Sequence, residues 1–185
     1  MKKTASWAPR ARSSALLGAL LLGCASAPPA APVAPPTRYA HAPAVDLRLA
    51  CLDGELALSS LRGRAVLLVA FTSENLASQL LLRHVDQVAA AHPDDLVAIA
   101  LAGDRMEFRD LALVLGTYRD VAGLTHSRLC GADESIRLGE SDLGRIDHVP
   151  TLFLLNRAGG VARRLEDVPT REAIEAMVAP ALPPR

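Results

Sequence analysis

The sequence predicts an α/β fold, in which helices pack on a mixed central sheet, from about residue 45 onward. Two continuously apolar runs, 65–71 and 96–101, are typical of central strands that are buried on both faces. A segment that can form a helix follows each run, and two short strand-like segments close to the C-terminus are separated by a glycine turn. Strands that alternate with helices indicate one layered α/β domain.

The first elements predict a hairpin that leads into a buried strand. Residues 45–49 alternate apolar with polar side chains, Leu52-Asp53-Gly54 supplies a turn, and residues 55–58 form the returning strand. Residues 59–64 then turn the chain into the apolar run Ala65 to Phe71.

A long helix is expected from about Glu74 to His92, ended by Pro93. Its periodicity predicts a buried side formed by Leu76, Leu80, Val85 and Val88. The same periodicity predicts a side that faces water, formed by Arg83, Asp86 and Gln87.

The second half predicts a strand at 96–101, a helix at 105–120 and then an irregular region. Thr151–Leu155 is expected as a strand, Ala158-Gly159-Gly160 as a turn, and residues 161–165 as the antiparallel partner. Thr170 is expected to cap a final helix that extends through Val178.

The first 23 residues have the layout of a secretory signal peptide. Four basic residues precede an apolar stretch, 15–22, that is far shorter than the roughly twenty residues of a membrane-spanning helix. The stretch ends in Leu21-Leu22-Gly23-Cys24, which resembles the lipobox of bacterial lipoproteins and implies a lipid anchor on Cys24. The alternative is an ordinary signal peptide with a chance cysteine.

Residues 24–44 are rich in alanine and proline and predict an extended tether, which leaves 45–185 as the folded domain. The whole chain has 20 basic and 20 acidic residues. Loss of the four basic residues of the first segment would leave a mildly acidic protein. This balance argues against a nucleic-acid partner, which needs a positive face to neutralise phosphates.

Three stretches together resemble the thioredoxin superfamily, in its redoxin or TlpA-like branch. They are Leu56–Leu68, which leads from a hairpin into a buried strand; Phe71, which leads directly into a helix; and His148–Gly160, which contains Val149-Pro150-Thr151. Asn156 stands where the family usually has an acid. The resemblance implies a thioredoxin-like sandwich with an N-terminal β-hairpin extension, and a cis Pro150 that faces the active site. The alternative for Pro150 is a trans proline that begins an edge strand.

The catalytic motif of that family is absent. Thiol-disulfide exchange needs a thiolate at a helix N-terminus and a second thiol one turn later, which C-x-x-C supplies. Counted from Phe71, Leu76 and Gln79 occupy those positions, and a shifted alignment places Asn75 and Ser78 there instead. A peroxiredoxin T-x-x-C that began at Thr72 would end on Asn75. The resemblance therefore implies a degenerate active-site motif without cysteine.

Cys51 and Cys130 lie far apart in the sequence, in the expected hairpin and in the irregular region. They are either a structural disulfide or inert buried thiols, or else a displaced redox pair. No metal or cofactor site is predicted, because the histidines have no ligand spacing. These histidines are His41, His84, His92, His126 and His148. His148 lies closest to Pro150 and is interpreted as a solvated or capping side chain, with a ligand or base as the alternative.

The segment Gly103–Glu107 follows the second buried strand and is interpreted as a helix start, with a catalytic acid as the alternative. Three functions remain open. The first is a membrane-anchored envelope module without redox activity that binds a protein or an extended peptide beside Pro150. The second is a thiol-disulfide oxidoreductase that uses Cys51 and Cys130 or the thiols of a partner. The third is a structural envelope protein.

Overall fold

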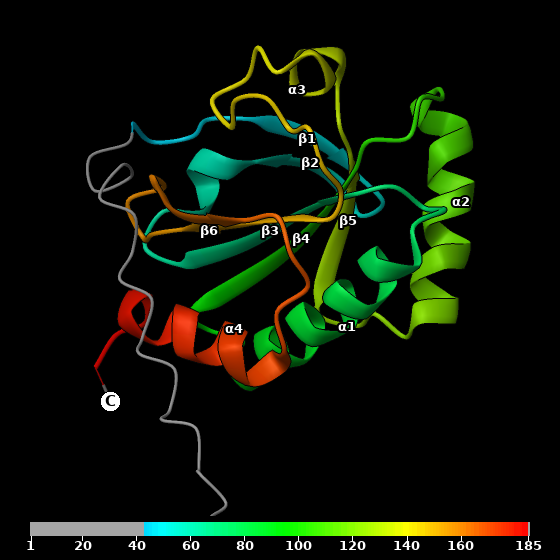
Figure 1. Ribbon diagram of the computed structural model, residues 1–185. Coiled ribbons are helices and arrows are strands. Elements are labelled where there is room, and N and C mark those ends of the chain that lie inside the picture. The colour runs from blue at the N-terminus through cyan, green and yellow to red at the C-terminus, as the bar shows by residue number, and fades with distance from the viewer. Residues whose placement is uncertain (1–42, 185) are drawn as a thin grey trace, which may run out of the picture. The chain divides into compact units, whose positions relative to one another are not determined.

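The computed structural model describes residues 43–184, which form one α/β sandwich (Figure 1). The strands are β1 (Arg48–Cys51), β2 (Gly54–Ala57), β3 (Ala65–Phe71), β4 (Leu96–Ala102), β5 (Ser127–Gly131), β6 (Thr151–Leu155) and β7 (Val161–Leu165). The α-helices are α1 (Leu76–Ala91), α2 (Phe108–Ala122), α3 (Glu134–Leu138) and α4 (Arg171–Val178). Short 3₁₀ helices follow β2 and α4, at Leu58–Leu61 and Ala179–Ala181.

The sheet is mixed, with the seven strands in the order β2-β1-β5-β4-β3-β6-β7. The three central strands β5, β4 and β3 are parallel, and β6 and β7 continue the sheet in antiparallel fashion. At the other edge, the β1–β2 hairpin joins β5 through two residue pairs, Ala50 with Gly131 and Cys51 with Cys130. The hairpin is therefore attached to the central sheet by a short ladder.

Each face of the sheet carries its own apolar core, because successive side chains of a strand point to opposite faces. On one face, alternate residues of β3 and β4 pack against α1, α2 and α4. On the other face they pack against α3, the β1–β2 hairpin and the segment before it. Figure 1 shows α3 above the sheet and α1 and α4 beneath it.

The structure confirms the predicted sandwich and most of its elements. The predicted strand 65–71 is β3, and β6 and β7 have the predicted bounds. Thr170 caps α4, with its hydroxyl oxygen accepting a hydrogen bond of 3.3 Å from the Ala173 N–H. In the turn between β6 and β7, the Asn156 side-chain oxygen accepts hydrogen bonds of 3.0 Å from the N–H groups of Ala158 and Gly160.

The region expected to be irregular contains β5 and α3. The segment Ser127–Gly131 has few apolar residues, yet it is buried because it lies between β1 and β4 in the sheet. Tertiary pairing, and not a local pattern, makes this segment a strand.

The buried side of α1 also differs from the expectation. Leu76 and Leu80 are exposed, at 77% and 51%, whereas Leu81 and Leu82 are fully buried. Asp86, expected to face water, is 6% exposed. Its carboxylate accepts hydrogen bonds of 3.2 and 2.9 Å from the N–H groups of Thr125 and His126, which offset the cost of its burial. Val85 and Val88 are buried and Arg83 and Gln87 are exposed, as expected. At about 3.6 residues per turn Leu76 lies opposite Val85, so Leu76 and Leu80 belong to the side that faces water.

The signal peptide at 1–23, the lipid-bearing Cys24 and the tether up to residue 42 lie outside the described residues. Of the tether, Pro43 and Ala44 are described, and Ala44 forms a β-bridge with Gly160. Within residues 43–184, no helix has the length and apolar character needed to cross a membrane.

Candidate functional site

The N-terminus of α1 and the segment 149–151 meet at the carboxyl end of the central strands. Asn75 caps α1, with its side-chain oxygen accepting a hydrogen bond of 3.1 Å from the Ser78 N–H. Its side-chain nitrogen donates a hydrogen bond of 3.2 Å to the Val149 carbonyl oxygen. The Val149–Pro150 peptide bond is cis. One asparagine therefore joins the helix N-terminus to the residue that precedes the cis proline.

The second connection at this end links the segments that follow β3 and β4. The Ser73 hydroxyl donates a hydrogen bond of 2.7 Å to the Asp104 carboxylate, which also accepts from the Ser73 N–H at 3.2 Å. Asp104 thus holds the turn that leads into α1. The segment Gly103–Glu107 does lead into a helix, but α2 begins at Phe108, three residues after the expected start at 105, with Glu107 as its N-cap.

The side chains of the first turn of α1 differ sharply in exposure. Leu76 is 77% exposed and Gln79 is half-buried. Asn75 lies half-buried at the surface beside Val149, whereas Ser78 is fully buried and its hydroxyl has no hydrogen-bond partner among residues 43–184. Asn75 and Ser78 are therefore the pair, three residues apart, that connects the surface beside Pro150 to the interior.

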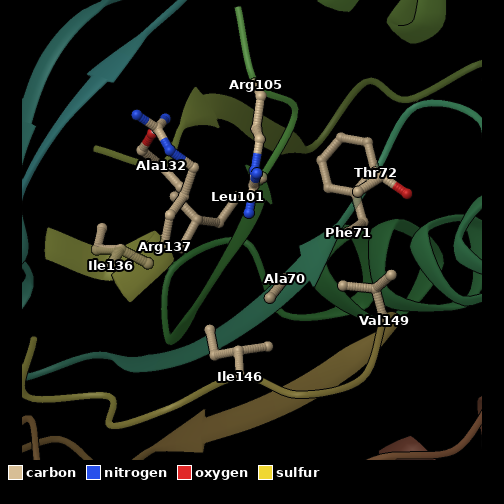
Figure 2. Close-up of a pocket in the computed structure, with 11 residues that line it drawn as sticks. Ala70, Phe71, Thr72, Leu101, Arg105, Ala132, Ile136, Arg137, Ile146 and Val149 are labelled. Atoms are coloured by element: carbon tan, nitrogen blue, oxygen red, sulfur yellow. The ribbon is translucent and has the colours of Figure 1, made fainter. Parts of the chain in front are cut away.

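A pocket of about 140 Å³ lies next to this junction, on the α3 side of the sheet (Figure 2). Its walls combine apolar side chains with two guanidinium groups. The residues that shape it include Leu101, Arg105, Ile136, Arg137, Ile146 and Val149. Because Val149 also accepts the Asn75 hydrogen bond, the pocket and the surface beside Pro150 are continuous.

Cys51 and Cys130, whose pairing the sequence left open, form a disulfide between β1 and β5. Their Cα atoms are directly opposite in the strand register and 3.8 Å apart. The two residues are 4% and 0% exposed and belong to the α3-side core, whereas α1 packs on the other face. The description "without cysteine" is therefore correct only for the segment 72–79, because the domain has a bonded pair elsewhere.

The disulfide lies close behind the pocket, although it is remote from the start of α1. Cys130 is the register partner of Leu101, and Ala132 follows it by two residues. Both Leu101 and Ala132 line the pocket. Both cysteines are buried within strands, and neither lies in the first turn of a helix, where a thiolate would be stabilised.

The remaining polar candidates do not form a catalytic group. His84 contacts the Pro169 carbonyl at 3.0 Å, and His126 lies 3.7 Å from the Asp86 carboxylate. His148 is exposed and accepts a hydrogen bond from the Thr151 hydroxyl through its carbonyl, at 2.6 Å. Within the described part of the chain, no three histidine, cysteine or acidic residues lie close enough together to hold a metal ion. His41 lies outside that part.

Tyr118, on α2, is the residue near this end of the sheet whose titration is most altered. Its ring packs against Phe71 with centroids 5.2 Å apart. Burial, opposed by the positive charge of Arg83 and assisted by the negative charge of Asp104, raises the pKa of Tyr118 to about 12. Its hydroxyl finds no hydrogen-bond partner in the described domain. Tyr118 is therefore a neutral core residue and not an acid–base group.

Comparison with known proteins identifies the fold. No protein-family model and no curated protein matches the chain. A thiol:disulfide interchange protein from Chlorobium tepidum superimposes with a TM-score of 0.61 at 22% identity, over 76% of this chain and 96% of the other. A secreted disulfide oxidoreductase of Mycobacterium tuberculosis gives 0.59 at 14% identity, over 72% and 95%. An exposed lipoprotein thioredoxin of Streptococcus pneumoniae gives 0.61 at 15% identity, over 73% and 98%. The chain therefore has the thioredoxin-like fold.

Proposed function

We propose that this protein is a binding module that holds an extended segment of a partner protein, without the redox chemistry of a C-x-x-C site. The binding place would be the pocket that Val149 lines and the adjoining surface of Asn75 and Leu76, together called the groove. The observation that carries the proposal is the Asn75–Val149 junction. It places a helix N-terminus against a cis proline, and neither Asn75 and Ser78 nor Leu76 and Gln79, the two alignments of the C-x-x-C positions, carry a thiol.

Two features support binding at this place. Val149 is 37% exposed and lies two residues before the first residue of β6, so its backbone can pair with an extended segment. Leu76, which follows Asn75 at the start of α1, exposes most of its apolar side chain, and a large exposed apolar residue favours a contact site. The groove therefore offers both backbone pairing and apolar contact.

The test is selection of binding peptides with the full chain, followed by mapping of their contacts by the NMR shifts of its backbone amides. We expect the selected peptides to shift the Asn75, Leu76 and Val149 amides. Leu76→Glu should weaken binding about tenfold or more, because it places a charge in an apolar contact. Ala90→Glu is the control, since Ala90 is exposed in the last turn of α1, at the other end of the helix from Leu76. Shifts that avoid the groove, or equal loss in both variants, would refute the proposal.

The second candidate function is thiol-disulfide exchange through Cys51 and Cys130. The closed bond favours it, since the two sulfurs of a redox couple are already together. The solved structures favour it too, because two of the three compared above are described as a thiol:disulfide interchange protein and a disulfide oxidoreductase. These findings support exchange more directly than they support a redox-inactive module, whereas the burial of both sulfurs favours the module.

Exchange would require a partner that carries two thiols. One partner thiolate would attack a sulfur of the bond, forming a mixed disulfide and releasing the other cysteine as a thiolate. The second partner thiol would then displace the first cysteine, so that the partner is oxidised and Cys51 and Cys130 are reduced by two electrons. Because both sulfurs are buried, the hairpin would have to separate from β5, which it meets through a two-pair ladder, the Leu52–Leu129 backbone hydrogen bond and the Asp53–Arg128 ion pair.

A redox titration separates the two functions. Alkylation and mass analysis in a series of thiol buffers would give the potential at which the bond opens. An exchange catalyst should open at roughly −120 to −270 mV, as known catalysts do, whereas a structural bond should resist reduction to about −300 mV or below. If the Cys51–Cys130 bond opens within the catalytic range and the protein reduces insulin, the oxidoreductase function is supported and the redox-inactive binding module is refuted.

We further propose that the protein is a lipoprotein of the bacterial envelope, anchored through Cys24 and held off the membrane by the segment 24–44. The sequence of residues 1–24 supports this, as does the fold shared with an exposed lipoprotein thioredoxin. The mass of the mature protein tests it. Acyl chains on a protein that begins at Cys24 are expected, and Cys24→Ser should release it from membranes. A mature chain without lipid would contradict the anchor and would indicate a secreted protein instead.

A further inference from the structure

The pocket beside Val149 has an uneven distribution of charge. Two arginines line it, Arg105 from the loop after β4 and Arg137 from α3, and no carboxylate of the described residues does. Figure 2 shows the Arg105 side chain extending over Leu101, and the Arg137 guanidinium beside Ala132 on the same side of the pocket. The rest of the wall is apolar apart from Thr72 and backbone.

Neither arginine is neutralised within the domain. Among residues 43–184, Arg105 and Arg137 have no carboxylate within salt-bridge distance, whereas Arg128 pairs with Asp53 at 2.8 Å and Arg164 with Glu166 at 2.7 Å. Arg137 donates one hydrogen bond, of 2.5 Å, to the Ala132 carbonyl, which fixes the guanidinium at the rim and leaves its other donors available. Two available guanidinium groups over one pocket are complementary to an anion.

The floor beneath these groups is aliphatic. Leu101 and Ile136 are almost fully buried, and Ile146 and Val149 complete the wall toward the cis proline. At about 140 Å³, the pocket has room for one side chain of moderate size and not for a cofactor. An occupant that fits must combine a short apolar part with a negative charge.

We propose that this pocket selects the partner segment by a carboxylate next to an apolar side chain, with the carboxylate bound by Arg105 and Arg137 and the apolar side chain placed against Ile146 and Val149. The inference rests on the proposed binding function, because it specifies which kind of partner segment the groove would bind. Guanidinium groups match a carboxylate in plane and can donate two hydrogen bonds to it. An acidic side chain and a C-terminal carboxylate both supply this chemistry.

Three peptides distinguish an acidic side chain from a C-terminal carboxylate. Each is titrated into the full chain, and binding is followed by the backbone amide shifts of the protein. The first carries a glutamate between two leucines and has both ends blocked. The second is the same peptide with glutamine. The third contains only leucine and glycine and has a free C-terminal carboxylate as its one acid. We expect at least one acidic peptide to bind about tenfold more tightly than the glutamine peptide.

The charge variants test the residues. Arg105→Gln with Arg137→Gln should abolish the preference for the acidic peptide, since the glutamine peptide never used the guanidinium groups. Arg163→Gln is the control for a lost positive charge, because Arg163 lies on β7, at the far edge of the sheet. All these variants should keep the native amide spectrum, which shows that the fold is intact.

The outcomes separate the inference from the function on which it rests. A preference lost in the Arg105 and Arg137 double variant and kept in Arg163→Gln supports the carboxylate site. Equal binding of the acidic and glutamine peptides, with shifts at Asn75 and Val149, overturns the carboxylate site and leaves the binding groove standing. Peptides that cause no shifts at the groove overturn both.

Discussion

The side chain of Asn75 donates a hydrogen bond of 3.2 Å to the carbonyl oxygen of Val149, across 74 residues of sequence. The same side chain caps α1 through the Ser78 N–H. These two hydrogen bonds hold the N-terminus of α1 against the residue that precedes the cis proline. They also identify Asn75 as the surface position and Ser78 as the buried position of the first helical turn.

Cysteines at these two positions should create a redox-active site. We expect the double substitution Asn75→Cys and Ser78→Cys to catalyse the reduction of insulin by dithiothreitol, because the first thiol would lie at the helix N-terminus and the second one turn later. The free amides and the helix dipole should lower the pKa of the thiol introduced by Asn75→Cys below the usual value of about 8.5. The measurements are an insulin-turbidity assay and the pH dependence of thiol alkylation.

The matched control is Leu76→Cys with Gln79→Cys, which places the same spacing one position further along the helix. Leu76 is largely exposed, and the hydrogen bond to Val149 comes from Asn75, so this pair should give little activity. Equal activity of the two pairs would show that the alignment derived from Asn75 and Ser78 is wrong.

The bond between Cys51 and Cys130 should contribute strongly to stability. It joins cysteines 79 residues apart and fastens the edge hairpin covalently to β5, with which the hairpin otherwise makes a short ladder, one further backbone hydrogen bond and one ion pair. Replacing both cysteines by alanine should lower the free energy of unfolding by about 2–5 kcal/mol, measured by urea denaturation. Cys24→Ser should leave the unfolding curve unchanged. If the double variant is as stable as the parent protein, the disulfide has no structural role.

Asp86→Asn should destabilise the domain by about 1–3 kcal/mol, because the Asp86 carboxylate accepts hydrogen bonds from two backbone N–H groups before β5 and is itself buried. Asp120→Asn provides the comparison. Its side chain is 75% exposed, so the change should cost no more than about 0.5 kcal/mol. Similar urea midpoints for the two variants would contradict the role given to Asp86.

Tyr118 should make the stability of the fold fall in alkaline solution. Its pKa is raised to about 12 in the folded state, while the unfolded residue titrates near its ordinary value of 10.0. The contribution of neutral Tyr118 is therefore fully present below pH 10 and is lost as the pH rises toward 12, where the unfolded state has released the proton.

Tyr118→Phe should make that alkaline decline shallower. At about pH 7 the substitution should be neutral or slightly stabilising, because the hydroxyl is buried without a partner in residues 43–184. Urea denaturation of both proteins from about pH 7 to about pH 11 measures the difference. Parallel curves over this range would show that Tyr118 titrates normally.

Local pattern determined most of the framework. The runs that became β3 and β4 contain only apolar residues, so their burial on both faces could be predicted from composition alone. The turn at Gly159, where φ is +88°, and the cap at Thr170 depend on residue types that act within a few positions. For the same reason the bounds of β6 and β7 agree with those expected from the sequence.

Features made by distant segments could not be predicted in this way. The strand β5 exists because β1 and β4 pair with it, and its own residues give a weak signal. The burial of Asp86 depends on the loop before β5, whose N–H groups donate hydrogen bonds to it, whereas the exposure of Leu76 and Leu80 follows from the helical period that places them opposite Val85.

The sequence by itself determined the α/β class, the positions of the long strands along the chain and the absence of a thiol pair at the start of α1, because each depends on residues close together in the chain. Only the tertiary structure decided that Cys51 and Cys130 are bonded, that Asn75 contacts Val149, and that Arg105 and Arg137 line one pocket. Each of these contacts joins segments that meet only when the sheet assembles. It therefore depends on packing and strand register, which a local sequence pattern does not reveal.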